Sequence, residues 1–381
     1  MSSVINLYSL VAEYVKNYNS TNNTVLDYNN FKNVLEYIPS YSGKIYEQLY
    51  DDNCELITCI RQFCNEQKTR TFLVSLSGGV DSMVLITIIH YLGYNVIGIH
   101  INYNNRPETI EEEKFLDTWC QLNSIRLYKK SISEIKRSNS KRSDYELITK
   151  NMRLDFYKEI MKRESCDLIL LAHHKDDIVE NIFANVCRGR YILDLAVIKK
   201  QSKISDINIG RPMIEFYKQI IYDFAHKYSV PYFKDTTPDW SVRGKYRNLI
   251  YPVVEDAFTK NVKDNLIGLS EQSYEWNELV TREIVKPFME KIKFTIDDFE
   301  SSIEFNIDNY RNHPMCFWNV VFMNIFNQFG YSCPSRKGIR TFINKVKEPS
   351  VCYVSISNNC KCYIKNSTIK IEFKNLIQKQ D

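Results

Sequence analysis

Two polar clusters, each directly after an apolar run, hold the residue types best suited to chemistry. The first is Ser77-Gly78-Gly79-Val80-Asp81-Ser82, which follows FLVSL and precedes an almost wholly apolar stretch. Two glycines let the backbone turn tightly and bring N–H groups close to an anion. A helix starting near residue 80 and the hydroxyls of Ser77 and Ser82 would add further donors. The cluster predicts a phosphate-binding loop that is neither a Walker loop nor a dinucleotide fingerprint.

Asp81 is the unusual member of this loop, because a carboxylate repels phosphate unless a cation lies between them. A Mg²⁺ ion that bridges Asp81 and the phosphates would remove the conflict. We therefore predict that Asp81 is a metal ligand. The alternative is a carboxylate that only caps the helix.

The second cluster is AHHKDDIVE, which follows the apolar run LILL. It brings two histidines, two aspartates and a glutamate to the start of a helix. His173, Asp177 and Glu180 are spaced for one helix face, with Asp176 alongside. One aspartate here would be an ordinary charged helix start. Five such side chains together favour a functional site.

The elements that must position both clusters alternate between strand and helix from Thr71 to about Val197. Apolar runs predict strands at 72–76, 95–101, 124–129 and 167–172, and helices at 80–92, 107–123, 145–164 and 174–188. This alternation predicts an α/β fold with a parallel sheet that is covered by helices on both faces. Ligands bind at the carboxyl ends of strands in such sheets, so both clusters should face one crevice.

The pattern differs on either side of this region. Residues 1–70 carry apolar-periodic pieces, among them NFKNVLEYI and CELITCIRQFC, which predict a helical N-terminal extension. After residue 260, three helical stretches precede the β-like VCYVSI, CKCYIK and TIKIEF, joined by the turn pairs Asn358-Asn359 and Asn366-Ser367. We predict three domains: a helical extension over 1–70, an α/β domain over 71–260 and a smaller α+β domain over 261–381.

Composition excludes several classes of protein. The 44% hydrophobic and 25% charged residues are typical of a globular chain, and no apolar run approaches the ~20 residues of a membrane span. The N-terminus resembles neither a secretory signal nor a transit peptide, so we expect a cytoplasmic protein. The 11 cysteines are scattered without a CxxC pair, which favours reduced, mostly buried thiols over a disulfide framework. A net charge of +4 permits a nucleic-acid partner without requiring one.

SGGVDS followed by AHHKDD-x-x-E resembles the PP-loop ATP-pyrophosphatase superfamily, whose fold is of the adenine-nucleotide alpha-hydrolase type. Within it the chain is most similar to the tRNA(Ile)-lysidine synthetase branch, through His100, NMRLDFY, Cys187-Arg188-Gly189, Arg211-Pro212 and DTTPDWSVRGKYRNLIYP. The resemblance covers residues 71–260 well, the C-terminal region weakly and residues 1–70 not at all. It implies that ATP–Mg²⁺ binds residues 77–82, that a tRNA base is adenylated, and that a nucleophile then displaces AMP.

The resemblance, together with the residue types, gives roles to individual positions. The expected catalytic residues are Asp81, Arg153, Asp176 and Asp177. The expected ATP-binding residues are Ser77, Gly78, Gly79, Val80, Asp81, Ser82, His100 and His173. The expected tRNA-binding residues are Arg188, Arg211, Arg243, Lys245 and Arg247. In the lysidine branch the base would be a wobble cytidine and the nucleophile lysine, so we expect ATP, Mg²⁺, tRNA and lysine as ligands.

Two alternatives stay open. The segment HINYNNRPETIEEEKFLDTWC is more similar to the tRNA 2-thiolation branch, and Thr237-Pro238 stands where the lysidine branch usually has Ser-Asn. Those thiolases generally carry cysteine pairs for zinc or an iron–sulfur cluster, so the absence of CxxC favours amine ligation. The other alternative is a nucleotide- or RNA-binding relative without turnover. The complete SGGVDS and HHKDD sets weigh against it.

Overall fold

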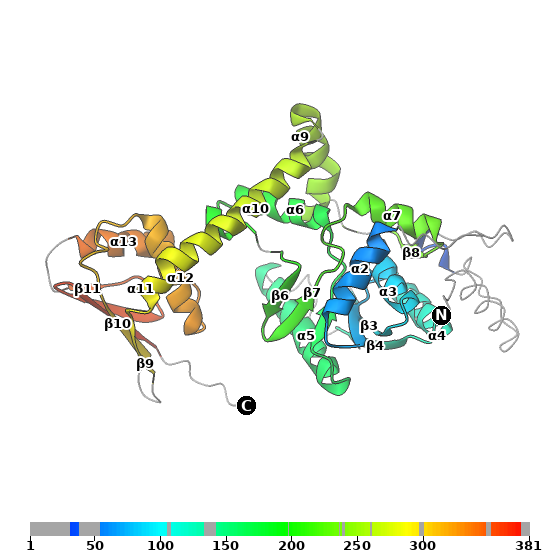
Figure 1. The fold of residues 1–381 in the computed structure, drawn as a ribbon, viewed down its shortest axis with the longest axis horizontal. Helices are drawn as coiled ribbons and strands as arrows, with labels where there is room; N and C mark the ends of the chain where they lie inside the picture. The colour runs from blue at the N-terminus through cyan, green and yellow to red at the C-terminus, as the bar shows by residue number, and fades with distance from the viewer. Residues whose placement is uncertain are drawn as a thin grey trace, which may run out of the picture. The chain divides into compact units, whose positions relative to one another are not determined.

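The computed structural model describes residues 31–37, 54–104, 108–132, 142–196, 198–235, 237, 241–259, 261–296, 301–347 and 352–374. They form two compact units (Figure 1). One runs to Arg188 and resumes over Ala196–Ser270, and the other comprises Gly189–Leu195 and the chain from Glu271 onward. Much of the expected N-terminal extension lies outside the described residues, and the three-domain division stays a prediction.

The first unit is built on a six-stranded sheet of order β4-β3-β2-β5-β7-β6. Its strands are β2 (Thr71–Ser75), β3 (Asn95–Asn102), β4 (Arg126–Ser131), β5 (Leu168–Leu170), β6 (Gln201–Ile204) and β7 (Ile207–Gly210). The first five strands in this order run parallel, and β6 pairs antiparallel with β7. The predicted α/β fold with a parallel sheet is confirmed. The β6–β7 hairpin at the edge was not predicted, because both strands are only four residues long and β6 is largely polar.

Helices cover both faces of this sheet, as predicted. They include α3 (Val80–Tyr91), α4 (Thr109–Leu122), α5 (Arg142–Arg163) and α6 (Lys175–Cys187). Side chains of α3 and α4 pack with Phe72 and Val74 of β2, whereas side chains of α5 pack with Leu73. Because successive strand residues point to opposite faces, α5 lies on the other face from α3 and α4. Helices α2 (Glu55–Glu66) and α7 (Lys218–Lys227) join the α3 face.

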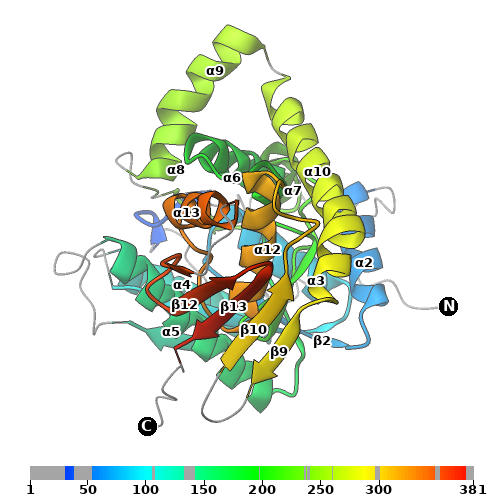
Figure 2. The ribbon, with the colours of Figure 1, turned by 90° about the vertical axis from the view of Figure 1, so that its left-hand side faces the viewer.

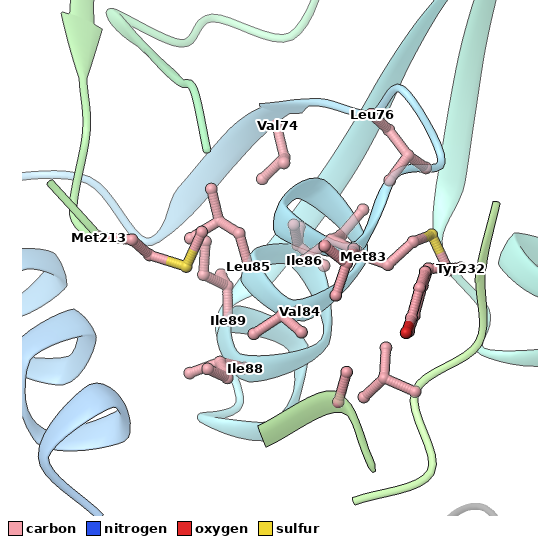
Figure 3. Close-up of a cluster of buried hydrophobic side chains, with 14 of the residues drawn as sticks. Val74, Leu76, Met83, Val84, Leu85, Ile86, Ile88, Ile89, Met213 and Tyr232 are labelled. Carbon is pink, nitrogen blue, oxygen red and sulfur yellow. The ribbon is translucent and has the colours of Figure 1, made fainter. Parts of the chain in front are cut away.

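Helix α3 is buried on nearly all sides. Its apolar residues from Met83 to Ile89 pack among Val74 and Leu76 of the β2 segment and Met213 and Tyr232 from later in the chain (Figure 3). A helix that is apolar all round is stable only inside a core. The polar loop at its start is therefore fixed to a helix that is buried in the core.

The strand order places the two polar clusters together. From β2 the chain adds β3 and then β4 on one side, and α5 then returns it to form β5 on the other side of β2. The strand order thus reverses between β2 and β5, which is where open α/β sheets bind their ligands. The phosphate-binding loop follows β2, and the HHKDD cluster follows β5.

Two observations differ from the helical extension predicted for residues 1–70. Leu35–Tyr37 forms a strand, β1, that pairs antiparallel with β8 (Tyr232–Phe233). The prediction of a helix from the apolar pattern of NFKNVLEYI (30–38) is therefore wrong at Leu35–Tyr37. Pairing with a distant strand and the burial of Leu35 override that local pattern. Helix α2 also packs in the same core as α3, so residue 70 is not a boundary between the units.

The second unit has its own five-stranded antiparallel sheet of order β11-β12-β13-β10-β9. The strands are β9 (Lys293–Ile296), β10 (Ser301–Asn306), β11 (Cys352–Val354), β12 (Cys360–Lys365) and β13 (Thr368–Phe373). Helices α12 (Met315–Gln328) and α13 (Arg336–Val346) pack on one of its faces (Figure 2). The three C-terminal strands and both turn pairs agree with the prediction, whereas β9 and β10 were not predicted.

The remaining elements are short or lie near the boundary of the units. They are η3 (Ile192–Asp194), α8 (Val242–Lys245), the π-helical turn η4 (Tyr246–Ile250), α9 (Tyr251–Phe258), α10 (Val262–Val280), the π-helical turn η5 (Thr281–Val285) and α11 (Lys286–Met289). Across the described part of the chain, every helix is too short or too polar to span a membrane.

Candidate active site

The loop between β2 and α3 has the geometry of an anion cradle. Gly78 has φ = +86°, and a Cβ at this position would lie 1.9 Å from Cε2 of Phe233. Only glycine fits both the backbone conformation and the space. The backbone N–H groups of Ser77 and Gly78 donate to Oγ of Ser82 over 3.2 and 3.1 Å, so the loop curls over the start of α3. These donors are the ones that phosphate oxygens would use.

His100 supports this loop from the neighbouring strand. It is buried at the carboxyl-terminal part of β3, and its Nδ1 lies 2.9 Å from the carbonyl oxygen of Leu76. Since a carbonyl oxygen only accepts, Nδ1 donates this hydrogen bond. Burial lowers the pKa of His100, which keeps the ring neutral. His100 therefore fixes the end of β2 from which the loop departs.

His174 is the centre of the second cluster. It is 1% exposed, and its ring nitrogens lie 3.5 Å from Asp81, 3.6 Å from Asp176 and 3.6 Å from Asp177. Burial alone would lower its pKa, but these carboxylates outweigh burial and raise it to about 9. The protonated ring therefore joins the phosphate-binding loop to the start of α6.

His173, the preceding residue, is held in the opposite state. Burial lowers its pKa to about 4. Its Nδ1 accepts a hydrogen bond of 3.1 Å from Nε of Arg211, which a protonated nitrogen could not do. Arg211 is only 4% exposed and also donates to the carbonyl oxygen of Lys199. This burial does not suit the tRNA contact expected for Arg211, which orients His173 instead.

Asp176 lies between two lysines of later elements. Its Oδ2 accepts from the backbone N–H of Lys218 at 2.8 Å, and its Oδ1 lies 2.5 Å from Nζ of Lys263. Burial acts to raise the pKa of Asp176, but His174 and Lys263 hold it well below its usual range. Asp176 is therefore ionised, and it faces the cavity described below.

Asp177 and Glu180 form ion pairs with two arginines, Arg243 and Arg247. Arg243 donates to Asp177 and, over 2.7 Å, to Glu180. Arg247 donates to Glu180 and, over 3.1 Å, to Asp235. Both arginines, expected to bind tRNA, thus contact the acidic side of α6, although the side chain of Arg243 is still 56% exposed.

A cavity of about 340 Å³ opens among these residues. Its charged lining comes from α6, α7 and the segment that follows, and the rest is chiefly aromatic. The lining residues are His174, Asp176, Val179, Glu180, Tyr217, Lys218, Gln219, Tyr222, Asp235, Tyr246, Arg247, Tyr251 and Lys263. A mixed polar and aromatic lining of this size suits a small organic substrate.

Asp81 fits the metal role that the sequence predicts. Its Oδ1 is buried and accepts no well-formed hydrogen bond among the described residues, although Nε2 of His174 lies 3.5 Å away, and its Oδ2 lies 3.6 Å from Nζ of Lys218. Mg²⁺ is usually held by one or two carboxylates together with substrate phosphates and water. In the described part of the chain, no group of three His, Cys, Asp or Glu side chains could hold a metal ion. Mg²⁺ at Asp81 would therefore need ligands from a nucleotide.

The other predicted residues are more dispersed. Arg153 is exposed on α5, one turn before Tyr157, whose hydroxyl lies 2.7 Å from Oγ of Ser75. Arg188 is exposed just after α6, and Lys245 is exposed at the end of α8. The described geometry does not bring these three side chains into the cavity lining.

Several site residues escaped the sequence analysis. The sequence analysis assigns no role to His174, although a second histidine beside two aspartates is a usable signal. Lys218, Lys263, Tyr217 and Tyr251 gave no such signal, because they follow the motif by about 40 to 90 positions in unremarkable helical sequence. Only the packing of α7, α9 and α10 near α6 brings them to Asp176.

Known proteins similar to this chain agree with the motifs. A family model for the PP-loop domain matches residues 53–253. The tRNA(Ile)-lysidine synthase of Enterococcus faecalis is 26% identical over 235 residues, which are 60% of this chain and 50% of that protein. The one of Chlamydia felis is 25% identical over 233 residues, 61% of this chain and 72% of that protein. This chain therefore matches half the length of the Enterococcus relative.

A solved structure is similar as well. The U34-tRNA thiolase NcsA from Methanococcus maripaludis aligns with a TM-score of 0.47 and 17% identity, over 59% of this chain and 82% of that one. The family match covers more than half of the 381 residues and includes both motifs and α2. The resemblance drawn from SGGVDS and HHKDD is thereby confirmed, and the chain belongs to the PP-loop family, which uses ATP.

Proposed function

We propose that this protein adenylates a tRNA base with ATP and then joins lysine to it, most specifically at a wobble cytidine. The observation that carries the proposal is the meeting of two motifs at the sheet's switch point, where Asp81 lies 3.5 Å from His174. The similar proteins from Enterococcus faecalis and Chlamydia felis are tRNA(Ile)-lysidine synthases, which supports the choice of substrate.

The phosphate-binding loop would act on the leaving group. As the carbonyl oxygen of the base attacks the α-phosphorus, negative charge grows on the departing pyrophosphate. The backbone N–H groups of Ser77 and Gly78, which donate to Oγ of Ser82 in this structure, and the hydroxyl of Ser82 would donate to it instead. Asp81 would hold Mg²⁺, which would neutralise phosphate charge when bound.

The second half of the reaction needs an amine beside the activated base. Asp176 lines the cavity, whereas Asp177 is 8% exposed and already paired with Arg243. Asp176 is therefore better placed to bind the incoming amine, and it could accept a proton from that amine only once Lys263 no longer pairs with it. His173 and Arg211 would form one wall of the nucleotide-binding site, next to the start of α6.

Exposed basic residues would meet the RNA. Lys245 and Arg188 lie at the ends of α8 and α6 and are exposed, and the side chain of Arg243 is partly so. Contacts of this kind bind phosphates without reading sequence. We assign tRNA binding to these three, and to Arg247 a place in the cavity wall.

Mass spectrometry of tRNA would test the proposal. Transcripts of isoleucine tRNA are incubated with the protein, ATP, Mg²⁺ and L-lysine, and then digested to nucleosides. A mass increase equal to lysine minus water on one cytidine is expected, and it should be absent when ATP is omitted. A sulfur adduct would favour the thiolation branch, and an unmodified tRNA would favour a binding protein; either result would contradict the proposal.

A further inference from the structure

Lys263 of α10 inserts its ammonium group into a cage formed by other parts of the chain. Its Nζ lies 2.5 Å from Oδ1 of Asp176, 4.7 Å from the ring centre of Tyr251 and 5.7 Å from the ring centre of Tyr217. A carboxylate and two aromatic faces around one nitrogen are the chemistry by which proteins recognise alkylammonium groups.

The walls of this cage are held independently of Lys263. The hydroxyl of Tyr217 donates to Asp264, and that of Tyr251 donates to Oε1 of Glu255 over 2.9 Å. Asp176 also accepts from the backbone of Lys218 at 2.8 Å. The cage would therefore keep its shape if the lysine side chain left it.

Among the carboxylates that line the cavity, Asp176 is the one that no arginine in the described part of the chain binds, although the protonated ring of His174 lies 3.6 Å from it. Glu180 and Asp235 are both bound by Arg247, which donates to each of them. Lys263, in contrast, reaches the cage on a flexible side chain that is 30% exposed, so it can move out into solvent. Its departure would open a charged, aromatic subsite within a cavity of about 340 Å³.

We propose that Asp176, Tyr217 and Tyr251 form a binding site for a primary alkylammonium group, which Lys263 occupies when substrate is absent. The ligand is the ε-ammonium of free lysine, an identification that rests on the proposed function. Lys263 is then an internal competitor of the amine substrate. A tethered group competes at an effective concentration of the order of millimolar, so it sets a lower limit on the lysine concentration at which the site fills.

Calorimetric titration of the full chain with L-lysine tests this directly, without tRNA. Lys263→Met removes the competing charge and should tighten lysine binding by about tenfold or more. Lys263→Arg keeps a cation that also binds aromatic faces, so its lysine affinity should stay near that of the wild type. Lys158→Met, which changes an exposed lysine of α5, is the matched control and should change nothing.

Two further titrations establish the chemistry of the site. L-norleucine has the side-chain length of lysine without the terminal ammonium, and Lys263→Met should not bind it measurably. Adding Tyr251→Leu to Lys263→Met removes one aromatic face and should weaken lysine binding by about three- to tenfold. Thermal unfolding of each variant verifies that it is folded.

The proposal is overturned if folded Lys263→Met binds lysine no more tightly than the wild type, or binds norleucine equally well. It is also overturned if Lys263→Arg tightens binding as much as Lys263→Met. Tighter lysine binding without any lysine adduct on tRNA would support the ammonium site and contradict the proposed function. A lysine adduct on tRNA, with a lysine affinity that is unchanged in Lys263→Met, would support the proposed function and contradict the ammonium site.

Discussion

At the scale of single residues, two neighbouring histidines differ in their protonation state. His173 is neutral, since burial and the Arg211 donor leave its Nδ1 as an acceptor. His174 is protonated, since three carboxylates surround a ring that is 1% exposed. The ring of His173 therefore accepts a hydrogen bond from Arg211, and the ring of His174 supplies a positive charge between the phosphate-binding loop and α6.

The charge on His174 predicts a stability that depends on pH. Its folded pKa of about 9 lies above the ordinary 6.5, so the stabilisation is complete below pH 6.5 and is lost as pH rises through 9. The difference between these two pKa values corresponds to about 3 kcal/mol of unfolding free energy. We expect the gap in unfolding free energy between wild type and His174→Gln to shrink by about this amount between about pH 6 and about pH 9.5, in urea titrations. A gap that is constant with pH would contradict the assignment.

Asp81 gives a prediction about catalysis. Asp81→Asn keeps the shape of the side chain but removes the charge that a cation would need, so ATP–pyrophosphate exchange should fall by a factor of about 100 or more. Asp167→Asn, at the opposite end of β5, is the control and should exchange normally. Thermal unfolding would verify that both variants fold. Normal exchange by Asp81→Asn would show that this carboxylate holds no metal.

At the scale of elements, the start of α3 depends on one glycine rather than on two. Gly78 has φ = +86°, and a methyl group there would lie 1.9 Å from the ring of Phe233. A Cβ on Gly79 would meet its nearest atom, Oγ of Ser77, at 3.6 Å, and Gly79 has φ = −69°, a value open to any residue. The loop therefore needs the first glycine for its shape and the second only for access to an anion.

The two glycines make a matched pair of variants. Gly78→Ala should lower the unfolding free energy by about 2 kcal/mol, because an L-residue with positive φ is strained and the methyl group displaces Phe233. It should also weaken ATP binding. Gly79→Ala should change stability by less than about 0.5 kcal/mol. Urea unfolding and ATP calorimetry would measure both, and equal stability of the two variants would contradict the loop geometry.

At the scale of the whole molecule, the parallel sheet brings together segments that are about 90 residues apart in sequence. Asp81 and His174 meet because β2 and β5 are neighbours in the sheet, although α3, β3, α4, β4 and α5 lie between these two strands along the chain. The second unit has its own sheet and its own core, so it does not depend on this arrangement for its packing.

The distribution of thiols predicts that the protein works without cysteine chemistry. All eleven cysteines are free. Cys166 is buried just before β5, at the end opposite the site, and burial raises its pKa, whereas Cys187 is exposed at the far end of α6. We expect Cys166→Ser with Cys187→Ser to keep the proposed tRNA-modifying activity, and the purified protein to hold no stoichiometric iron or zinc. Lost turnover in a folded double variant, or a metal–sulfur centre in elemental analysis, would indicate thiolation instead.

The sequence by itself determined the α/β class and the location of both motifs. Apolar runs such as FLVSL and LILL are local signals, and β-strands form where they predict. The Gly-Gly pair before a helix and the aspartates at a helix start are local as well, because they reflect backbone geometry and the charge of a helix terminus. These features need no knowledge of distant neighbours.

Only the tertiary structure decided which charges meet. The strand at Leu35–Tyr37 exists because β8 pairs with it, and Arg211 is buried because β7 ends beside His173. The protonation of His174 and the placement of Lys263 on Asp176 depend on groups that come from separate elements. Pairing, burial and charge state arise from neighbours in space, and a pattern read along the chain carries no information about them.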